Sequence, residues 1–544
     1  MMRGAVVGLL SLLSPACALQ GLPIRAGHKL AKQASIQAQA SIQSADYPQY
    51  PEYNLSVPID HFHNDSKYEP HSDGSFNLRY WFDAQFYKPG GPVFVLSAGE
   101  TSGEDRLPFL EKGIVYEIAK ATHGLGVILE HRYYGSSVPT PDLSTENLRF
   151  LTTDQALADT AYFAKNVQFE GLEDVDFSPE KVPWIAYGGS YAGAFVAFLR
   201  VAYPDVFFGA ISSSGVPAAI WDYWEYFEAA RIYAPEGCSD SQGKLVNIVD
   251  RILLDEANAG YIDQVKALFG KADIADDADF AVTVGEGIGW LQSYNWDPAI
   301  SSDEFFNYCA TITSDENQFP DLEDKRAEVE EIIKVAGYGD ELDPLTDRML
   351  NLIGYTIASS SSSAADVVSY ADDDLSQTWR LWPYQVCTEW GFLQTGSGAP
   401  EDMLPMVSRL VDLDYSTRIC RDAFDISEPA DTDAINKYGA FDISYPRLAF
   451  VDGEWDPWRA AGVQALSQPP RESTTSEPVI LIDGAVHHWD ENGVWPNETQ
   501  PGLPPKAVKE TKKAMRQFVK AWLKEWKKGH HGGGHHGGGH HGHD

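Results

Sequence analysis

The chain has 544 residues and a formal net charge of −38 at pH 7. This length is too great for one simple core and is enough for two large lobes. The excess of carboxylates repels phosphate and therefore excludes nucleic acid as a partner. It also favours an acidic working pH, because protonation relieves the mutual repulsion of carboxylates. The solubility of a secreted protein explains the same charge equally well.

The first 18 residues (1–18) have the pattern of a secretory signal peptide. Arg3 is followed by an apolar stretch at 5–13 and by the small-x-small cleavage site Ala16-Cys17-Ala18. Residues 19–45 are polar and rich in Gln, Ser and Ala, as in a propeptide or a flexible N-terminal arm. No later segment approaches the roughly 20 apolar residues of a membrane span. We therefore expect a protein that is secreted, or delivered to an acidic vacuole-type compartment, with no membrane partner.

Two stretches of the chain, 46–215 and 441–528, alternate apolar runs with helical segments. The runs typical of buried parallel strands lie at 92–96, 125–130, 182–187, 208–214, 447–451 and 478–482. Strand–helix alternation of this kind predicts a doubly wound, mostly parallel sheet. We expect one α/β domain built from both stretches, closed by an amphipathic helix at about 505–528.

The stretch between them, 216–440, shows no strand alternation. It carries an aromatic helical segment at 221–227, an acidic helix at 321–335 and a serine run at 359–363 that suggests a loop. We interpret it as a mostly helical cap inserted into the α/β domain. The tail 529–544 alternates Gly triplets with His pairs. We expect it to be flexible, and either to bind transition-metal ions weakly or to be an engineered handle.

A serine lies at the apex of a glycine-rich turn, Gly188-Gly189-Ser190-Tyr191-Ala192-Gly193, directly after the apolar run 182–187. A turn this tight needs Gly or Ala beside the serine, which then faces the positive end of a helix dipole. This is the nucleophile elbow of an α/β-hydrolase, although the last Gly comes one position later than in G-x-S-x-G. We predict Ser190 as the nucleophile of an α/β-hydrolase fold, with the cap inserted between the nucleophile and acid strands.

A serine needs a base to take its proton and a carboxylate to hold that base in the right tautomer. In α/β-hydrolases the acid and then the histidine follow the serine, on loops after later strands. Here the loop after the next-to-last strand offers three carboxylates, and the loop after the last strand offers two histidines: Asp452, Glu454, Asp456, His487 and His488. The residues alone leave the choice within each set open.

The oxyanion hole of such an enzyme needs two backbone donors. Tyr191, the residue after the nucleophile, supplies one N–H. The loop 97–100 after an early strand supplies the other, with Gly99 as our candidate. His131 precedes the serine in the chain, and we expect it to be a buried hydrogen-bonding residue and not the base.

Cysteine usage agrees with secretion. Cys17 leaves with the signal peptide, and the four remaining cysteines allow three pairings in an oxidising compartment. We expect the sequential pairing, Cys238–Cys309 and Cys387–Cys420. Glycosylation sequons lie at Asn54, Asn64 and Asn497.

Five separated motifs agree in order with one known family. They are Gly-Gly-Ser-Tyr-Ala-Gly at 188–193, Glu-His-Arg-Tyr-Tyr-Gly at 130–135, Cys-Thr-Glu-Trp-Gly at 387–391, Gly-Glu-Trp-Asp-Pro-Trp at 453–458 and Ala-Val-His-His at 485–488. Over roughly residues 46–528, the chain resembles the Pro-Xaa carboxypeptidase and dipeptidyl-peptidase II family of serine peptidases. The resemblance is nearest to the acid-active prolyl endoprotease branch of that family.

The resemblance implies an α/β-hydrolase with an inserted helical cap, Asp456 as the acid and His487 as the base. It also implies cleavage after proline, with no metal and no organic cofactor. The chain departs from the family in two places. Val486 replaces a smaller residue, and Trp489-Asp490-Glu491 replaces a Leu-Asp-Leu-Arg-like run, which we expect to alter a pocket wall or the substrate preference.

A proline ring is compact and apolar, so flat aromatic side chains hold it best. Trp458 is the first candidate for such a wall, with Trp382 and Trp390 next, and Glu389 is a candidate for gripping a substrate terminus. We predict a secreted, acid-active serine endopeptidase for proline-containing peptides and proteins. The alternatives are an exopeptidase of the same family, an esterase or lipase, and a catalytically silent binding domain.

Overall fold

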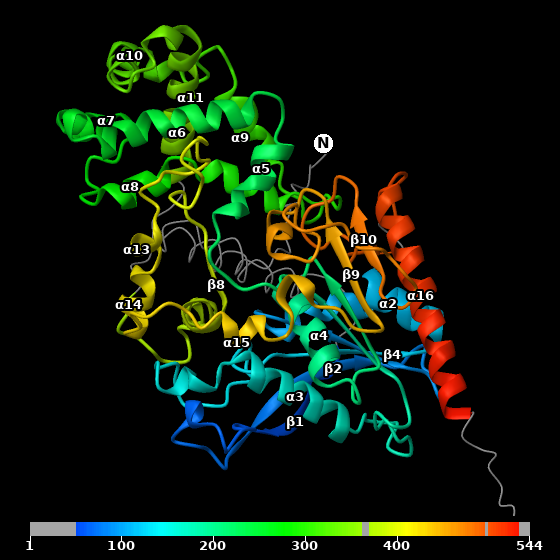
Figure 1. Ribbon diagram of the computed structural model, residues 1–544. Coiled ribbons are helices and arrows are strands. Elements are labelled where there is room, and N and C mark those ends of the chain that lie inside the picture. The colour runs from blue at the N-terminus through cyan, green and yellow to red at the C-terminus, as the bar shows by residue number, and fades with distance from the viewer. Residues whose placement is uncertain (1–49, 362–368, 496–498, 532–544) are drawn as a thin grey trace, which may run out of the picture.

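The computed structural model in Figure 1 describes residues 50–361, 369–495 and 499–531. The expected signal peptide 1–18, the arm 19–45, the sequon at Asn497 and the tail beyond residue 531 lie outside these described residues.

A mostly parallel sheet of eight strands forms the centre of the molecule, in the order β1-β2-β4-β3-β5-β6-β9-β10. Its strands are β1 (Tyr53–Pro58), β2 (Ser75–Asp83), β3 (Val93–Ser97), β4 (Leu125–Leu129), β5 (Trp184–Gly189), β6 (Gly209–Ser213), β9 (Leu448–Gly453) and β10 (Val479–Ile482). From β4 to β10 all neighbours run parallel. The sheet confirms the predicted doubly wound α/β fold, and each of the six predicted strands lies in it.

The first two strands are absent from the sequence prediction and run antiparallel at one edge of the sheet. β1 alternates exposed residues with partly or fully buried ones. β2 contains Arg79, which is buried because its guanidinium pairs with Glu130, 2.7 Å away at the end of β4. A search for apolar runs misses such strands, because the burial of Arg79 depends on a partner that is distant in the sequence.

Helices cover both faces of the sheet (Figure 1). The chain steps from β3 to β4 in one direction and from β5 to β6 in the other, so right-handed crossovers place the connecting helices on opposite faces. The pairs in contact are α2 (Gly113–Thr122) with α16 (Lys506–His531), and α3 (Thr153–Asn166) with α4 (Tyr191–Ala202). The last helix occupies the predicted place and buries Met515, Val519 and Trp522.

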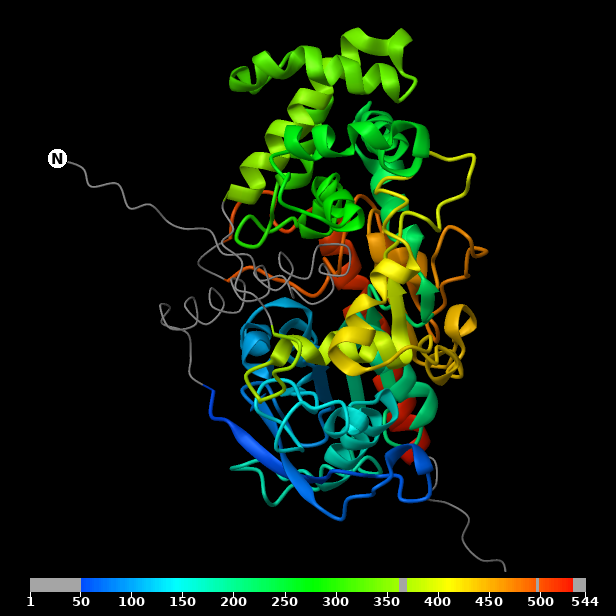
Figure 2. The ribbon, with the colours of Figure 1, turned by 90° about the vertical axis from the view of Figure 1, so that its left-hand side faces the viewer.

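The insertion between β6 and β9 is a helical cap, and its first part, drawn in green, stands above the α/β domain in Figures 1 and 2. Its helices are α5 (Glu228–Tyr233), α6 (Cys238–Leu254), α7 (Ile262–Leu268), α8 (Asp277–Thr283), α9 (Glu304–Ile312), α10 (Arg326–Val335), α11 (Leu342–Ser361), α12 (Leu381–Gln385), α13 (Leu413–Ser416), α14 (Arg418–Phe424) and α15 (Asp433–Asn436).

Two details of the cap differ from the sequence prediction. Strands β7 (Ile220–Asp222) and β8 (Gly391–Leu393) form a small parallel sheet where only helices are predicted. The serine run begins inside α11, which ends at Ser361, and residues 362–368 lie outside the described part.

Disulfides join the cap internally, in the predicted sequential pairing: Cys238–Cys309 and Cys387–Cys420. The side chains of Asn54 and Asn64 are exposed, as glycosylation requires. Within the described ranges, none of the helices combines the length and the apolarity needed to cross a bilayer.

Candidate active site

Ser190 lies at the turn between β5 and α4, with φ 60° and ψ −128°. A non-glycine residue adopts this conformation only when its surroundings hold it there. The Ser190 N–H donates to the carbonyl of Ser213 at the end of β6, 2.9 Å away. A Cβ on Gly188 would lie 2.1 Å from the Ala192 carbonyl oxygen, so the turn tolerates only glycine there. These contacts hold Ser190 at the carboxyl end of the sheet.

Two backbone segments meet beside Ser190. Helix α4 begins at Tyr191, so the first N–H groups of its first turn have no acceptor within the helix. Gly99 follows β3 with φ +71°, and a Cβ there would lie 3.2 Å from the Ala192 Cβ. The loop that contains Gly99 therefore lies against the start of α4, as an oxyanion hole requires.

His487 and Asp456 form a buried pair. His487 Nδ1 lies 2.9 Å and 3.0 Å from the two carboxylate oxygens of Asp456, and both side chains are 3% exposed or less. Burial opposes the charge of Asp456, but the His487 ring and the N–H of Trp458 more than compensate, so the pKa of Asp456 lies below its ordinary value. An ionised carboxylate can only accept, so Nδ1 carries a proton, and in the neutral ring the lone pair is on Nε2. Among the described residues, Nε2 has no hydrogen-bond partner.

The other two candidate acids are engaged elsewhere. Asp452 accepts a hydrogen bond from Gln464 Nε2, and burial raises the pKa of Asp452 to about 7. Glu454 accepts the backbone N–H of Gly484, 3.0 Å away. The sequence leaves three carboxylates open, and the structure brings only Asp456 to His487.

His488 lies beside the elbow and pairs with Glu491. A Cβ on Gly189 would lie 3.2 Å from His488 Cγ, and the ring centroids of His487 and His488 are 4.5 Å apart. Burial disfavours the charged form of His488, but Glu491 Oε2 at 2.9 Å outweighs it, so the pKa of His488 is raised. This pair uses a carboxylate from the run that departs from the family pattern.

Asp490 and Trp489, from the same run, anchor it to two other parts of the chain. Asp490 accepts from the hydroxyls of Tyr187 on β5 and Ser213 on β6, and burial raises the pKa of Asp490. Trp489 Nε1 donates to the carbonyl of Tyr294 in the cap, 3.1 Å away. The run therefore joins the histidine loop to both the sheet and the cap.

His131 is a buried hydrogen-bonding residue, as expected. Its Nδ1 lies 2.8 Å from the Arg132 carbonyl and its Nε2 lies 2.9 Å from the Tyr191 hydroxyl. Burial lowers the pKa of His131 to about 4, so the ring is neutral above that pH. Nδ1 therefore donates to the carbonyl, and Nε2 accepts from Tyr191.

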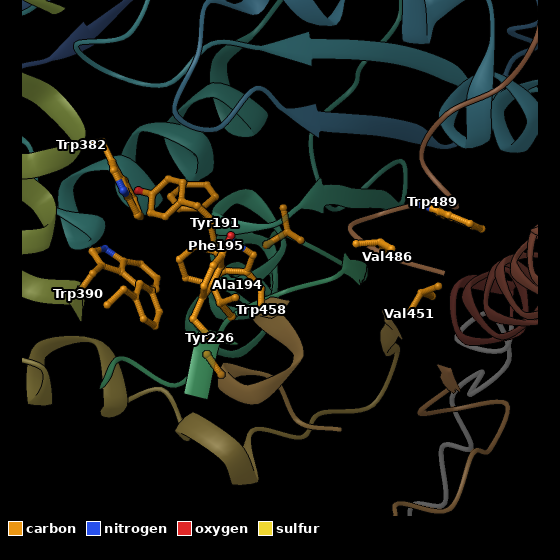
Figure 3. Packing of buried hydrophobic residues seen from close by; sticks show 14 of the residues in the cluster. Tyr191, Ala194, Phe195, Tyr226, Trp382, Trp390, Val451, Trp458, Val486 and Trp489 are labelled. Carbon is orange, nitrogen blue, oxygen red and sulfur yellow. The ribbon is translucent and has the colours of Figure 1, made fainter. Parts of the chain in front are cut away.

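Aromatic side chains line the region beside the elbow (Figure 3). The rings of Trp382 and Trp390 lie 5.4 and 5.1 Å from the ring of Tyr191. Phe392 joins the two halves of the cluster, since its ring is 5.9 Å from Trp390 and 5.2 Å from Trp458. The structure thus brings all three predicted tryptophans into one cluster around the residue after Ser190.

Three members of this region are missed by sequence reasoning. Tyr223 stacks on Trp458 with ring centroids 5.4 Å apart, and Gln292 Oε1 accepts from Trp458 Nε1 at 2.8 Å. Phe392 lies on β8, and the pairing of β8 with β7 places it in the aromatic cluster. Tyr223 belongs to the aromatic segment 221–227, which was a usable signal, whereas nothing local distinguishes Gln292.

Glu389 has a different place from the one expected. Its carboxylate is 2% exposed, with one oxygen 2.9 Å from Lys67 Nζ and the other accepting the backbone N–H of Thr153 at 3.0 Å. Both oxygens are thus engaged, in an ion pair and at the N-terminus of α3. The sequence prediction of a terminus-gripping carboxylate did not foresee these partners, because both lie more than 200 residues away.

Comparison with known proteins agrees with this architecture. The model of the family described as serine carboxypeptidase S28 matches residues 58–503. A probable extracellular serine carboxypeptidase of Arthroderma benhamiae is 51% identical over 488 residues, covering 87% of this chain and 68% of that protein. Serine protease vicPb of Bipolaris victoriae is 29% identical, covering 79% of this chain and 82% of its own.

Among solved structures, proline iminopeptidase of Mycobacterium smegmatis is 11% identical with a TM-score of 0.31, covering 87% of this chain and 100% of that chain. That likeness is too distant to inform on activity. The family match spans most of the chain, and the first relative is more than half identical in sequence. The chain belongs to the serine carboxypeptidase S28 family of serine peptidases, which includes the Pro-Xaa carboxypeptidases and dipeptidyl-peptidase II that its motifs resemble.

Proposed function

We propose that Ser190, Asp456 and His487 form the catalytic triad of a secreted serine peptidase that cleaves after proline at acidic pH. The observation that carries this proposal is the buried Asp456–His487 pair beside the strained turn of Ser190. In the neutral ring this pair places the lone pair on Nε2 of His487, and that atom is the one that must take the serine proton.

The proposed reaction is acyl transfer to the serine. As Ser190 Oγ attacks the peptide carbonyl, its proton moves to His487 Nε2, and the ionised Asp456 stabilises the imidazolium. The carbonyl oxygen becomes an oxyanion, to which the Tyr191 N–H and the Gly99 loop donate. His487 then protonates the leaving amine, and water hydrolyses the acyl-enzyme through the same groups. No step requires a metal or an organic cofactor.

The preference for proline is supported by the aromatic cluster. The cluster begins at Tyr191, the residue after Ser190, whose ring contacts Trp382 and Trp390. Flat rings bury a compact apolar ring without requiring it to satisfy a polar group. The hydrogen bond from Trp458 Nε1 to Gln292 holds the far end of the cluster in one orientation.

The acidic working pH is supported by two buried carboxyls that are not members of the proposed triad. Burial raises the pKa of Asp452 to about 7 and the pKa of Asp250 to about 6. A carboxyl whose folded pKa is raised favours the folded state fully below its unfolded pKa, and that contribution is lost as the pH rises through the folded pKa. These two groups therefore stabilise the fold at about pH 4 and stop doing so between about pH 6 and 7.

Secretion is supported by the signal-like residues 1–18 and by the two disulfides. The relative from Arthroderma benhamiae also carries the word extracellular in its name. Together these features favour an enzyme that acts on peptides and proteins outside the cell.

A carboxypeptidase is the second candidate, because that relative is named a serine carboxypeptidase. Such an enzyme needs a cation to bind the terminal carboxylate of its substrate. Arg106 lies in the segment after the Gly99 loop, where its Nε donates to the Ala98 carbonyl at 3.3 Å and its charge acts on His488 and Glu491. Its position beside the elbow and the histidine loop makes Arg106 our candidate for binding the terminal carboxylate.

Hydrolysis of an amino-blocked peptide with a proline-nitroanilide bond, across acidic and neutral pH, tests the proposed function. We expect release with an acidic optimum, abolished in Ser190→Ala. Activity on simple esters without release from this substrate would refute the proposed endopeptidase activity. A peptide that is blocked at both ends and contains an internal Pro-Xaa bond then distinguishes an endopeptidase from a carboxypeptidase, since only the endopeptidase cleaves it. In a carboxypeptidase, Arg106→Gln would raise KM for free-carboxylate substrates and leave KM for their amides unchanged.

A further inference from the structure

Three side chains of the β1–β2 connection gather at one point outside the active site. Asp60, His63 and His71 each offer one ligand atom, and these atoms all lie within 4.8 Å of one another. Imidazole nitrogens and a carboxylate oxygen are the donors that Zn²⁺ and its neighbours in the first transition row prefer. We propose that Asp60, His63 and His71 form a binding site for a divalent transition-metal ion, best suited to Zn²⁺.

The distances fit a tetrahedral ion after a small side-chain adjustment. Zn²⁺ binds nitrogen and oxygen at about 2.0–2.2 Å, so neighbouring ligand atoms lie roughly 3.3 Å apart. Asp60 Oδ2 and His71 Nδ1 are 2.8 Å apart, and the ring centroids of His63 and His71 are 5.4 Å apart. An ion would separate the first pair slightly and draw in His63, whose side chain is 49% exposed.

The carboxylate of this set is already oriented. Asp60 is 2% exposed, and its Oδ1 accepts from the Phe62 N–H and from Gln155 Nε2, both at 2.8 Å. Oδ2 is thereby aimed at His71. Contacts of this kind fix a metal-binding carboxylate and raise the affinity of the site.

A fourth ligand is within reach. Asp73 is fully exposed, and its Oδ1 lies 3.9 Å from His63 Nδ1. A small movement of the loop would bring this carboxylate to the ion, and water would otherwise complete the tetrahedron. The resulting set, two imidazoles with one or two carboxylates, has a net charge suited to a divalent cation.

The role of such an ion would be structural. It would fasten the β1–β2 connection to α3 through Asp60 and Gln155. The same connection carries Lys67, which pairs with Glu389 next to the aromatic cluster. The site lies outside the proposed triad, so its test does not depend on peptidase activity.

Titration with Co²⁺ and Zn²⁺ at neutral pH, where the histidines are available as ligands, tests the proposal. The seven histidines of the tail 529–544 are replaced by serine in every protein compared, because they would also bind these ions. The variants are His63→Ala and His71→Ala. The matched control is His123→Asn, at an exposed histidine with φ 57°, a conformation that Asn tolerates.

We expect the parent protein to bind one Co²⁺ with the absorption of a tetrahedral complex, to release it to Zn²⁺, and to melt at a higher temperature when Zn²⁺ is present. Each of the two ligand variants should bind more than about 100-fold more weakly and lose the rise in melting temperature. His123→Asn should behave as the parent. A parent protein without such absorption, or ligand variants that bind as tightly as the parent, would overturn the proposal.

Discussion

Replacing Asp452 with Asn should remove a large part of the pH dependence of folding. Asp452 is 2% exposed at the end of β9, where Gln464 Nε2 donates to its Oδ2. Asn has nearly the same volume and keeps an oxygen for Gln464, but it cannot ionise. The substitution therefore tests whether the buried carboxyl is neutral in the folded enzyme at acidic pH.

The magnitude follows from the two protonation states. Burial raises the pKa of Asp452 from 3.8 to about 7. Below pH 4 the group is protonated in both the folded and the unfolded chain, and above pH 7 it is ionised in both. Between these limits the folded state holds the proton more tightly, so stability falls as the pH rises. The loss over this window is on the order of 4 kcal/mol.

Urea unfolding of both proteins at several pH values between these limits measures the effect. Wild type should lose stability more steeply than Asp452→Asn, by roughly 4 kcal/mol in total. The free energies of unfolding of the two proteins should also differ by a constant amount, because the new amide N–H₂ has no acceptor. The test therefore compares how steeply each free energy changes with pH, and not the absolute values. Asp250→Asn gives a second comparison. It should reduce the pH dependence of stability by a smaller amount, and its effect should end near pH 6, because the pKa of Asp250 is raised only to about 6. Equal slopes for wild type and Asp452→Asn would refute the reasoning.

Three further substitutions test the site. Asp456→Asn should lower kcat about 10³–10⁴-fold in a folded protein, because the amide no longer selects the Nδ1–H tautomer; a loss below tenfold would contradict the assignment. Gly188→Ala puts a Cβ 2.1 Å from the Ala192 carbonyl oxygen, so it should lower both Tm and kcat, whereas Gly289→Ala, with open space around its Cβ, should leave both unchanged. Trp458→Phe keeps an aromatic side chain, although a smaller one, and removes the donor to Gln292, so kcat/KM for proline substrates should fall roughly tenfold. An unchanged preference for proline would remove Trp458 from the proposed pocket.

Local sequence determined the features that depend on neighbouring residues. The nucleophile elbow is set by glycines at fixed distances from Ser190, since no other residue fits against the start of α4. The parallel strands inside the sheet, β3 to β6 and β9, are almost wholly buried, so each is an apolar run that can be recognised without its partners. The final helix shows its packing face through its periodicity.

Tertiary structure decided what depends on distant partners. Asp452, Glu454 and Asp456 follow the same strand, and only the turn after β9 determines that Asp456 meets His487. Glu389 is held by residues that lie hundreds of positions earlier, so its engagement in an ion pair has no local signature. A carboxylate's environment is a property of the folded interior, whereas its identity is a property of the chain. The sequence therefore identifies the chemical groups that are available, and the packing of the sheet and the cap determines which of them come into contact.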